Sequence, residues 1–185
     1  MSTCGLDFGT SNTTLGTVVD GVPVLTALEG SHTTIPSAIF YEVDGAVLIG
    51  RKAIESYVEG APGRLMRSLK SVLGASLVEE TTRTGRGRTS FRDIIAYYLA
   101  AVKRRAEFAT GSELRNVVHG RPVFFVDNAP DADRKAEETL RQIAREVGFD
   151  DVTFQFEPIA AALEYERQLS AEEVALIADT GGGRS

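Results

Sequence analysis

Two short segments near opposite ends of the chain share a residue pattern that suits phosphate binding. The first reads LDFGTS (residues 6–11) and the second reads ADTGGG (residues 178–183). In each, an apolar stretch ends in aspartate, and after one further residue glycine and other small residues follow. Glycine allows the backbone to turn sharply and approach a ligand, and successive N–H groups of a tight turn bind anions. Both segments are therefore candidate phosphate loops.

The aspartates of the two segments, Asp7 and Asp179, indicate a metal ion as well. A carboxylate does not attract phosphate, but it can hold a hydrated Mg²⁺ that bridges to phosphate. The small hydroxyls of Thr10 and Ser11 add hydrogen-bond donors. Either segment alone is most often a simple turn, but the repetition predicts two related lobes that grip a polyphosphate between two hairpins.

Two other nucleotide-binding patterns, the P-loop and the Rossmann pattern, do not fit this sequence. The GxxxxGK[ST] pattern of a P-loop is absent from the sequence. The segment GRG (residues 85–87) follows a polar stretch rather than a buried strand, so the sequence does not predict a Rossmann dinucleotide site.

The elements that would position these loops form two patterns. Residues 3–7, 13–19 and 22–25 read as three strands of a meander, with the turn Asp20-Gly21 between the last two. From residue 116 the pattern alternates: strand 117–126, helix 131–147, strand 152–156, helix 158–168 and strand 174–179. The sequence therefore predicts an α/β fold, a β-meander followed by βαβαβ with a largely parallel sheet.

An α+β insert separates the two patterns. It comprises strands 35–43 and 46–49, helices 51–59 and 64–73, a polar surface loop 81–89 and a long helix 90–108 with Ser90 as its N-cap.

The composition excludes several classes of protein. The chain has 185 residues, 43% of them hydrophobic and 25% charged, with a net charge of −6. These values are typical of a globular domain, and the acidity disfavours general nucleic-acid binding. No apolar run is long enough to span a membrane, and we expect no membrane partner. The N-terminus lacks the pattern of a signal peptide, and the single cysteine, Cys4, cannot form an internal disulfide. We therefore expect a cytoplasmic protein.

Several segments resemble one known superfamily. LDFGTSNTTLG is similar to the first phosphate loop of the actin, sugar-kinase and seventy-kilodalton heat-shock (DnaK-type) ATPases, IADTGGGRS to their second, and FEPIAAALEYE to their first connecting segment. The Glu-Pro dipeptide that opens an alanine-rich helix favours the chaperone branch. HTTIPSAIFY, AVLIGRKAIE and SLKSVLG extend the resemblance over almost the whole chain. The sequence GRPV and the segment of residues 64–74 are similar to the corresponding segments of the YegD-type chaperones.

The resemblance implies a ribonuclease H-like, actin-type lobe. Residues 1–35 and 115–170 would form the core of lobe I, residues 36–114 an inserted α+β subdomain, and residues 171–185 the first strand and phosphate loop of a truncated lobe II. It implies ATP or ADP with Mg²⁺ as ligands, and unfolded client proteins and co-chaperones as partners. Since the adenosine pocket of the superfamily lies mostly in lobe II, we expect weak nucleotide binding and no ATPase activity from these residues alone.

The resemblance also assigns roles to individual residues. Lys70 matches the catalytic lysine that reaches the γ-phosphate, with Glu157 and Asp179 as further catalytic groups. Asp7, Glu157 and Asp179 match the carboxylates that bind Mg²⁺ through water. The residues that match phosphate contacts are Gly9, Thr10, Ser11, Gly181, Gly182 and Gly183. Two departures are Arg184, where chaperones have a small hydroxyl residue, and Thr180, which replaces an aliphatic one.

Three functions remain open from the sequence. The leading one is the N-terminal lobe of an ATP-hydrolysing heat-shock chaperone. The second is a small-metabolite (sugar) kinase of the same superfamily, for which Asp127 is the candidate base. The third is a non-catalytic actin-like scaffold, in which Arg184 marks a degraded site. Without the resemblance, Lys70 would read as an exposed helix lysine, and the two histidines, His32 and His119, read as structural.

Overall fold

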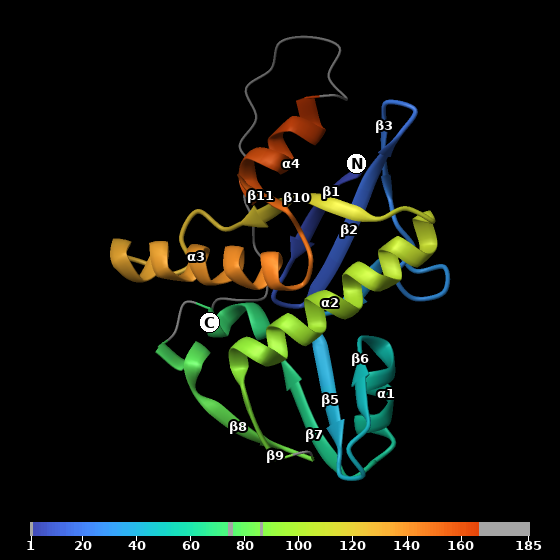
Figure 1. The fold of residues 1–185 in the computed structure, drawn as a ribbon, viewed down its shortest axis with the longest axis vertical. Helices are drawn as coiled ribbons and strands as arrows, with labels where there is room; N and C mark the ends of the chain where they lie inside the picture. The colour runs from blue at the N-terminus through green and yellow to red at the C-terminus, as the bar shows by residue number, and fades with distance from the viewer. Residues whose placement is uncertain (1, 74–75, 86, 167–185) are drawn as a thin grey trace.

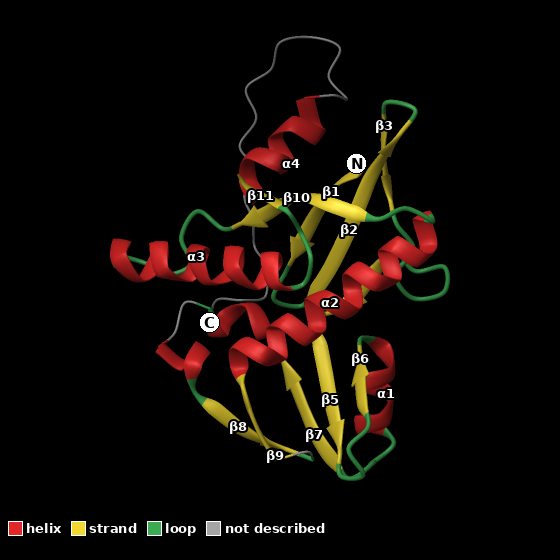
Figure 2. Ribbon diagram, in the orientation of Figure 1, coloured by secondary structure: helices red, strands yellow, loops and turns green. Residues whose placement is uncertain are grey.

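The computed structural model describes residues 2–73, 76–85 and 87–166, which form a sheet with helices and a smaller inserted part. Figures 1 and 2 show the inserted strands and α1 at one end of the molecule and the larger sheet at the other. The mixed α/β class that the sequence predicts is confirmed. The predicted strand 174–179 and the second phosphate loop lie outside the described residues.

The larger sheet has six strands, which are β1 (Ser2–Phe8), β2 (Asn12–Val19), β3 (Val22–Leu25), β4 (Thr34–Pro36), β10 (Leu114–Arg121) and β11 (Asp151–Phe156). The main order is β11-β10-β1-β2-β3, and β4 pairs with β2. β1, β10 and β11 run parallel, whereas β2 is antiparallel to β1, β3 and β4. The predicted meander and the parallel arrangement of the later strands are thus confirmed.

Residue alternation along β1 separates the two faces of the sheet. Cys4, Leu6 and Phe8 are buried in the main core, while Gly5 and Asp7 point to the opposite, exposed face. Side chains of α2 (Phe91–Thr110) and α3 (Pro130–Glu146) complete that core. The sheet therefore has one face covered by α2 and α3 and an opposite face that these two helices leave open, and the carboxylate of Asp7 lies on this open face.

Residues next to its two ends explain where the long helix α2 begins and ends. The Ser90 hydroxyl accepts a hydrogen bond from the Asp93 N–H at 3.0 Å, which confirms Ser90 as the N-cap of α2. Gly111 follows with φ of 64°, the left-handed conformation that glycine adopts without strain.

The inserted part has its own small sheet and core. Strands β5 (Ala38–Glu42), β6 (Val47–Ile49) and β7 (Gly63–Arg67) pair in the order β6-β5-β7, and helix α1 (Arg51–Val58) packs on them. Ala38, Phe40 and Ala53 form a separate buried cluster there. The predicted strand 35–43 is divided at Ser37 into β4 and β5.

Three predicted elements are wrong. Residues 64–73 form strand β7 and a 3-10 turn, η1 (Leu69–Val72), rather than a helix. Gly63 lets β7 pair closely with β5, because a Cβ there would lie 2.5 Å from the Phe40 ring and the Tyr41 carbonyl. Residues 81–89 are not an irregular loop: β8 (Thr81–Thr84) and β9 (Gly87–Ser90) form a hairpin, and a second 3-10 turn, η2 (Ser76–Glu79), precedes it.

The third wrong element is the strand predicted over residues 117–126. Strand β10 ends at Arg121, because Pro122 has no N–H to continue the ladder. The Arg121 side chain turns back and pairs with Asp133 and Glu137 of α3. Residues 122–129 are therefore a loop at the carboxyl edge of the sheet.

Helix α4 (Glu157–Glu166) follows β11 directly and lies against β10 and β11. No helix among the described residues is long and apolar enough to cross a membrane.

Candidate functional site

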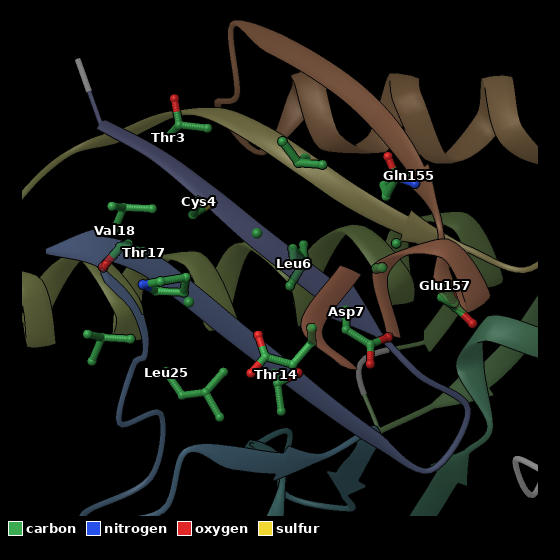
Figure 3. A pocket seen from close by; sticks show the side chains of 18 of the residues that line it. Thr3, Cys4, Leu6, Asp7, Thr14, Thr17, Val18, Leu25, Gln155 and Glu157 are labelled. Carbon is green, nitrogen blue, oxygen red and sulfur yellow. The ribbon is translucent and has the colours of Figure 1, made fainter. Parts of the chain in front are cut away.

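The candidate site lies where the parallel strands end. Asp7 is near the end of β1, Gly120 near the end of β10, and Glu157 follows β11. All three residues line a pocket of about 1240 Å³ on the open face of the sheet, between β1, β2, β3 and α4. Figure 3 shows the Asp7 and Glu157 side chains among those around this pocket. The carboxyl ends of parallel strands are the usual position of ligand sites in α/β sheets.

Lys70 reaches this site from the insert and pairs with Glu157. Its ammonium group donates a hydrogen bond to the Glu157 carboxylate across 87 residues of sequence. The exposed fraction of the side chain is 9% for Lys70 and 22% for Glu157. The interpretation of Lys70 as an exposed helix lysine is wrong, because the residue is buried and belongs to η1.

The Glu157 side chain lies beside Gly120 of β10, at a distance where a Cβ would make only ordinary van der Waals contacts. A Cβ on Gly120 would lie 3.4 Å from Glu157 Cγ and 3.5 Å from the Leu6 carbonyl. Glu157 is the first residue of α4, and Pro158 follows it. A carboxylate is stabilised at a helix N-terminus, and proline is favoured in the first turn. The structural and the predicted metal-binding roles of Glu157 are therefore compatible.

The first candidate phosphate loop is a tight turn between β1 and β2. The Gly9 N–H donates to the Asn12 carbonyl at 3.0 Å, and a Cβ on Gly9 would lie only 2.5 Å from that oxygen. The Ser37 hydroxyl donates to the Gly9 carbonyl at 2.7 Å, and the Ser37 N–H donates to the Ser11 carbonyl at 2.9 Å. Ser37 thus fixes both ends of the loop that contains Thr10.

A buried hydroxyl network supports this loop, and the sequence analysis missed it. Thr13 lies 2.9 Å from Ser37, oxygen to oxygen, and the Tyr98 hydroxyl lies 3.0 Å from both the Thr13 hydroxyl and the Pro36 carbonyl. Burial raises the pKa of Tyr98 to about 12, so the phenol stays protonated. The only sequence signal was the segment HTTIPS, in which small hydroxyl residues surround a proline.

His119 belongs to β10 and is fully buried. Its Nδ1 lies 2.8 Å from the Gly120 carbonyl and so carries the proton, and Nε2 has no hydrogen-bond partner among the described residues. Burial lowers the pKa of His119 to about 4, and the charge of Lys70 acts in the same direction. His119 is therefore neutral near pH 7.

The structure brings together Lys70, Glu157 and the pocket that Asp7 lines. Gly9, Thr10 and Ser11 lie together in the β1–β2 turn. Asp179, Gly181, Gly182 and Gly183, the other half of the predicted site, lie outside the described residues. Asp127, the candidate kinase base, lies in the loop 122–129 and does not line the pocket of Asp7 and Glu157.

The residues present fit a hydrated magnesium ion with a phosphate. Within the described ranges no three His, Cys, Asp or Glu side chains gather into a metal cluster. Mg²⁺ does not need such a cluster, because it keeps several waters and binds one or two carboxylates together with substrate phosphates. Asp7 and Glu157 supply two carboxylates around one pocket, and the Lys70 ammonium is paired with Glu157.

Comparison with curated proteins finds chaperones as relatives of this chain. No protein-family model matches the chain. The chain is 33% identical to a chaperone protein HscA homolog of Bordetella petrii, 31% identical to one of Azoarcus sp., and 30% identical to chaperone protein HscA of Edwardsiella ictaluri. Each match covers 97% of this chain. These similarities support the seventy-kilodalton heat-shock chaperone family.

The matched region is a limited part of these heat-shock chaperones. The chain spans 30% or 31% of the length of the three relatives. The activity and partners of the whole protein are therefore a matter for proposal.

Proposed function

We propose that this chain is the N-terminal lobe of a heat-shock-type chaperone that binds and hydrolyses ATP. The buried Lys70–Glu157 pair beside the pocket of Asp7 is the observation that carries the proposal. Burying a lysine costs free energy, and the ion pair with Glu157 offsets that cost. A positive charge at the carboxyl edge of a parallel sheet suits phosphoryl transfer, because it stabilises the oxygens of the transferred group.

The Lys70 ammonium exchanges partners when substrate arrives. Glu157 holds it at the pocket, and a triphosphate carries enough negative charge to draw the ammonium toward the γ-phosphate. The Glu157 carboxylate is then released to accept hydrogen bonds from water. Each group satisfies the other until substrate arrives, so neither is left as an uncompensated buried charge.

The remaining groups position the phosphates and the metal. The N–H groups and hydroxyls of Gly9, Thr10 and Ser11 would bind phosphate, and the brace from Ser37 holds that loop in shape before binding. Asp7 and Glu157, with Asp179, would hold Mg²⁺ through water, and Gly181, Gly182 and Gly183 would form the second phosphate loop. When bound, Mg²⁺ neutralises phosphate charge during transfer.

The finer assignments rest on the sequence resemblance. They are the ribonuclease H-like topology and the division into residues 1–35 with 115–170, 36–114 and 171–185. A cytoplasmic location is proposed as well, from the low cysteine content. The resemblance to YegD-type chaperones has no support from the relatives above, which are of the HscA type. In the complete protein, hydrolysis would shift a cleft between open and closed states and so control the binding of unfolded clients and co-chaperones.

The test is phosphate release from Mg-ATP by the full-length protein and by its Lys70→Met variant. We expect Lys70→Met to lower the rate at least about a hundredfold while Mg-ATP binding persists. Lys103→Met is the matched control, because Lys103 is another buried lysine, paired with Glu107 away from the pocket. Equal effects of the two variants, or an unchanged rate in Lys70→Met, would refute the proposal.

The same assay separates the alternatives. A chaperone is expected to release phosphate faster when an unfolded peptide is added. A kinase is expected to form ADP and a phosphorylated sugar, without free phosphate, when a sugar is added, so ADP is measured alongside phosphate. A scaffold is expected to release no phosphate under any of these conditions.

A further inference from the structure

A second groove lies away from the Asp7 pocket, between helix α2 and the part of the chain that contains β6 and α1. It has a volume of about 860 Å³, and its walls are α2, the turn of residues 27–32, β6 and the first turns of α1. Its base contains apolar side chains, among them Leu28 and Ile49. The proposed ATPase activity makes no use of this groove.

The α2 wall presents an apolar stripe at helical spacing. Tyr97, Ala101, Arg104 and Phe108 follow each other at steps of four, three and four residues, which places them on one face. Phe108 is 92% exposed and Tyr97 is 43% exposed. Such a stripe, with the small Ala101 at its centre, has the spacing of helices that pack along each other. From Tyr97 to Phe108 it extends about 16 Å, or roughly three helical turns.

The groove is basic although the chain as a whole is acidic. Arg51, Lys52, Arg104 and Arg105 line it, against the carboxylates Glu29 and Glu55, in a chain of net charge −6. Glu29 pairs with Arg51 and Arg105. Among the described residues, Lys52 and Arg104 have no ion-pair partner. These two cations, Arg104 within the stripe on α2 and Lys52 on α1, are therefore available to an acidic ligand.

The position of the guanidinium groups is fixed in advance. The Glu29 carboxylate accepts hydrogen bonds from Arg51 Nη1 at 2.8 Å and Arg105 Nη1 at 3.0 Å, and the Arg51 N–H donates to it at 3.2 Å. A Cβ on Gly50 would lie 2.3 Å from Glu29 Oε1, so glycine is needed for this contact. Since these side chains are already ordered, a ligand that contacts them loses little conformational entropy on binding.

We propose that this groove binds an acidic amphipathic helix of a partner protein. Apolar side chains of that helix cover Tyr97, Ala101 and Phe108, and its flanking carboxylates pair with Lys52 and Arg104. A second copy of this chain would bring the same cations face to face, which like-charge repulsion disfavours. Charge complementarity thus selects an acidic helix from a different protein as the occupant.

The probe is a fluorescein-labelled peptide of about 18 residues, with leucines at the stripe spacing and glutamates beside them. Fluorescence anisotropy measures its binding to the full chain. We expect saturable binding that weakens in high salt, and an affinity at least about tenfold lower for the double variant Lys52→Glu/Arg104→Glu. Phe108→Ala is expected to weaken binding as well, and it should not disturb folding, because the ring is almost fully exposed.

Two controls make the test specific. Lys135→Glu reverses an exposed charge on α3, outside the groove, and should leave the affinity unchanged. A peptide with lysine at every glutamate should not bind. The proposal is overturned if the acidic peptide does not bind, if the lysine peptide binds as well, or if the double variant binds normally. Self-association of the chain that Phe108→Ala abolishes would instead assign the groove to a second copy.

Discussion

Two ion-pair clusters join the insert to the rest of the molecule, and they differ in how completely their charges are satisfied. In the first, Lys70 faces the single carboxylate of Glu157, and Asp7 lines the same pocket. In the second, Glu29 has two arginine partners, Arg51 and Arg105, and a backbone N–H as well. The first is a simple pair at a pocket, and the second is a network that ties the turn 27–32 to α1 and α2.

We infer that the first cluster can exchange its ion-pair partner for a ligand, whereas the second cluster stabilises the fold. Glu29 accepts several hydrogen bonds at once, so an incoming ligand would have to break all of them. The Lys70–Glu157 pair has one connection to break, and a phosphate can replace the carboxylate at the ammonium. We therefore expect substitutions in the first cluster to change chemistry and those in the second to change stability.

The largest effect is expected for Glu157→Gln in the full-length protein. Loss of the carboxylate removes a proposed ligand of the hydrated metal, and phosphate release should fall about a hundredfold. The thermal midpoint should fall as well, because the buried Lys70 ammonium loses its counter-charge. A protein that stays folded at the assay temperature does not lose a hundredfold in rate for that reason. Glu164→Gln is the matched control, since Glu164 lines the same pocket from the same helix. A normal rate in Glu157→Gln would remove the functional distinction between the clusters.

An intermediate effect is expected from acid, because His119 lies next to the first cluster. The pKa of His119 falls from 6.5 to about 4 on folding, chiefly through burial. The unfolded chain therefore binds more protons between these values, and the free energy of unfolding decreases as the pH drops. Between pH 6.5 and 5 the loss is about 1.6 kcal/mol.

Urea unfolding at several pH values measures this dependence. His119→Leu should flatten it, because the variant has no imidazole at that position to protonate. His32→Gln is the control, since His32 is exposed in the folded chain. An unchanged pH dependence in His119→Leu would show that other groups cause the acid sensitivity.

The smallest effect is expected in the second cluster. Glu29→Gln removes the charge that holds Arg51 and Arg105 but keeps an oxygen that can accept hydrogen bonds. We expect a decrease of about 1.5 kcal/mol in the free energy of unfolding, measured by urea, with phosphate release unchanged. A large fall in phosphate release with stability intact would instead place Glu29 in the functional machinery.

Where local signals decide the structure, the sequence predicted it well. The meander follows from apolar alternation and the Asp20-Gly21 turn, and α2 begins at the Ser90 cap as expected. Predictions failed where pairing partners lie far away in the sequence. Residues 63–67 become a strand because they pair with β5, and β10 stops at Arg121, whose side chain binds α3.

The candidate site shows the same division. Asp7, Lys70 and Glu157 could be selected from motifs and resemblance. The burial and pairing of these three side chains could not be predicted from the sequence. The hydrogen bonds among Ser37, Thr13 and Tyr98 that support the first loop could not be predicted either, because they join residues far apart in the chain. The unpartnered Nε2 of His119 also had no sequence signal, because burial is a property of the packed sheet.

By itself the sequence determined the residue types at the two candidate loops, the spacing of apolar residues along strands and helices, and the net acidity of the chain. Only the tertiary structure decided that Lys70 points inward to Glu157, and that Asp7 lies on the open face of the sheet. Side-chain periodicity depends on neighbours a few positions away, whereas an ion pair across 87 residues depends on how two separately formed parts pack together.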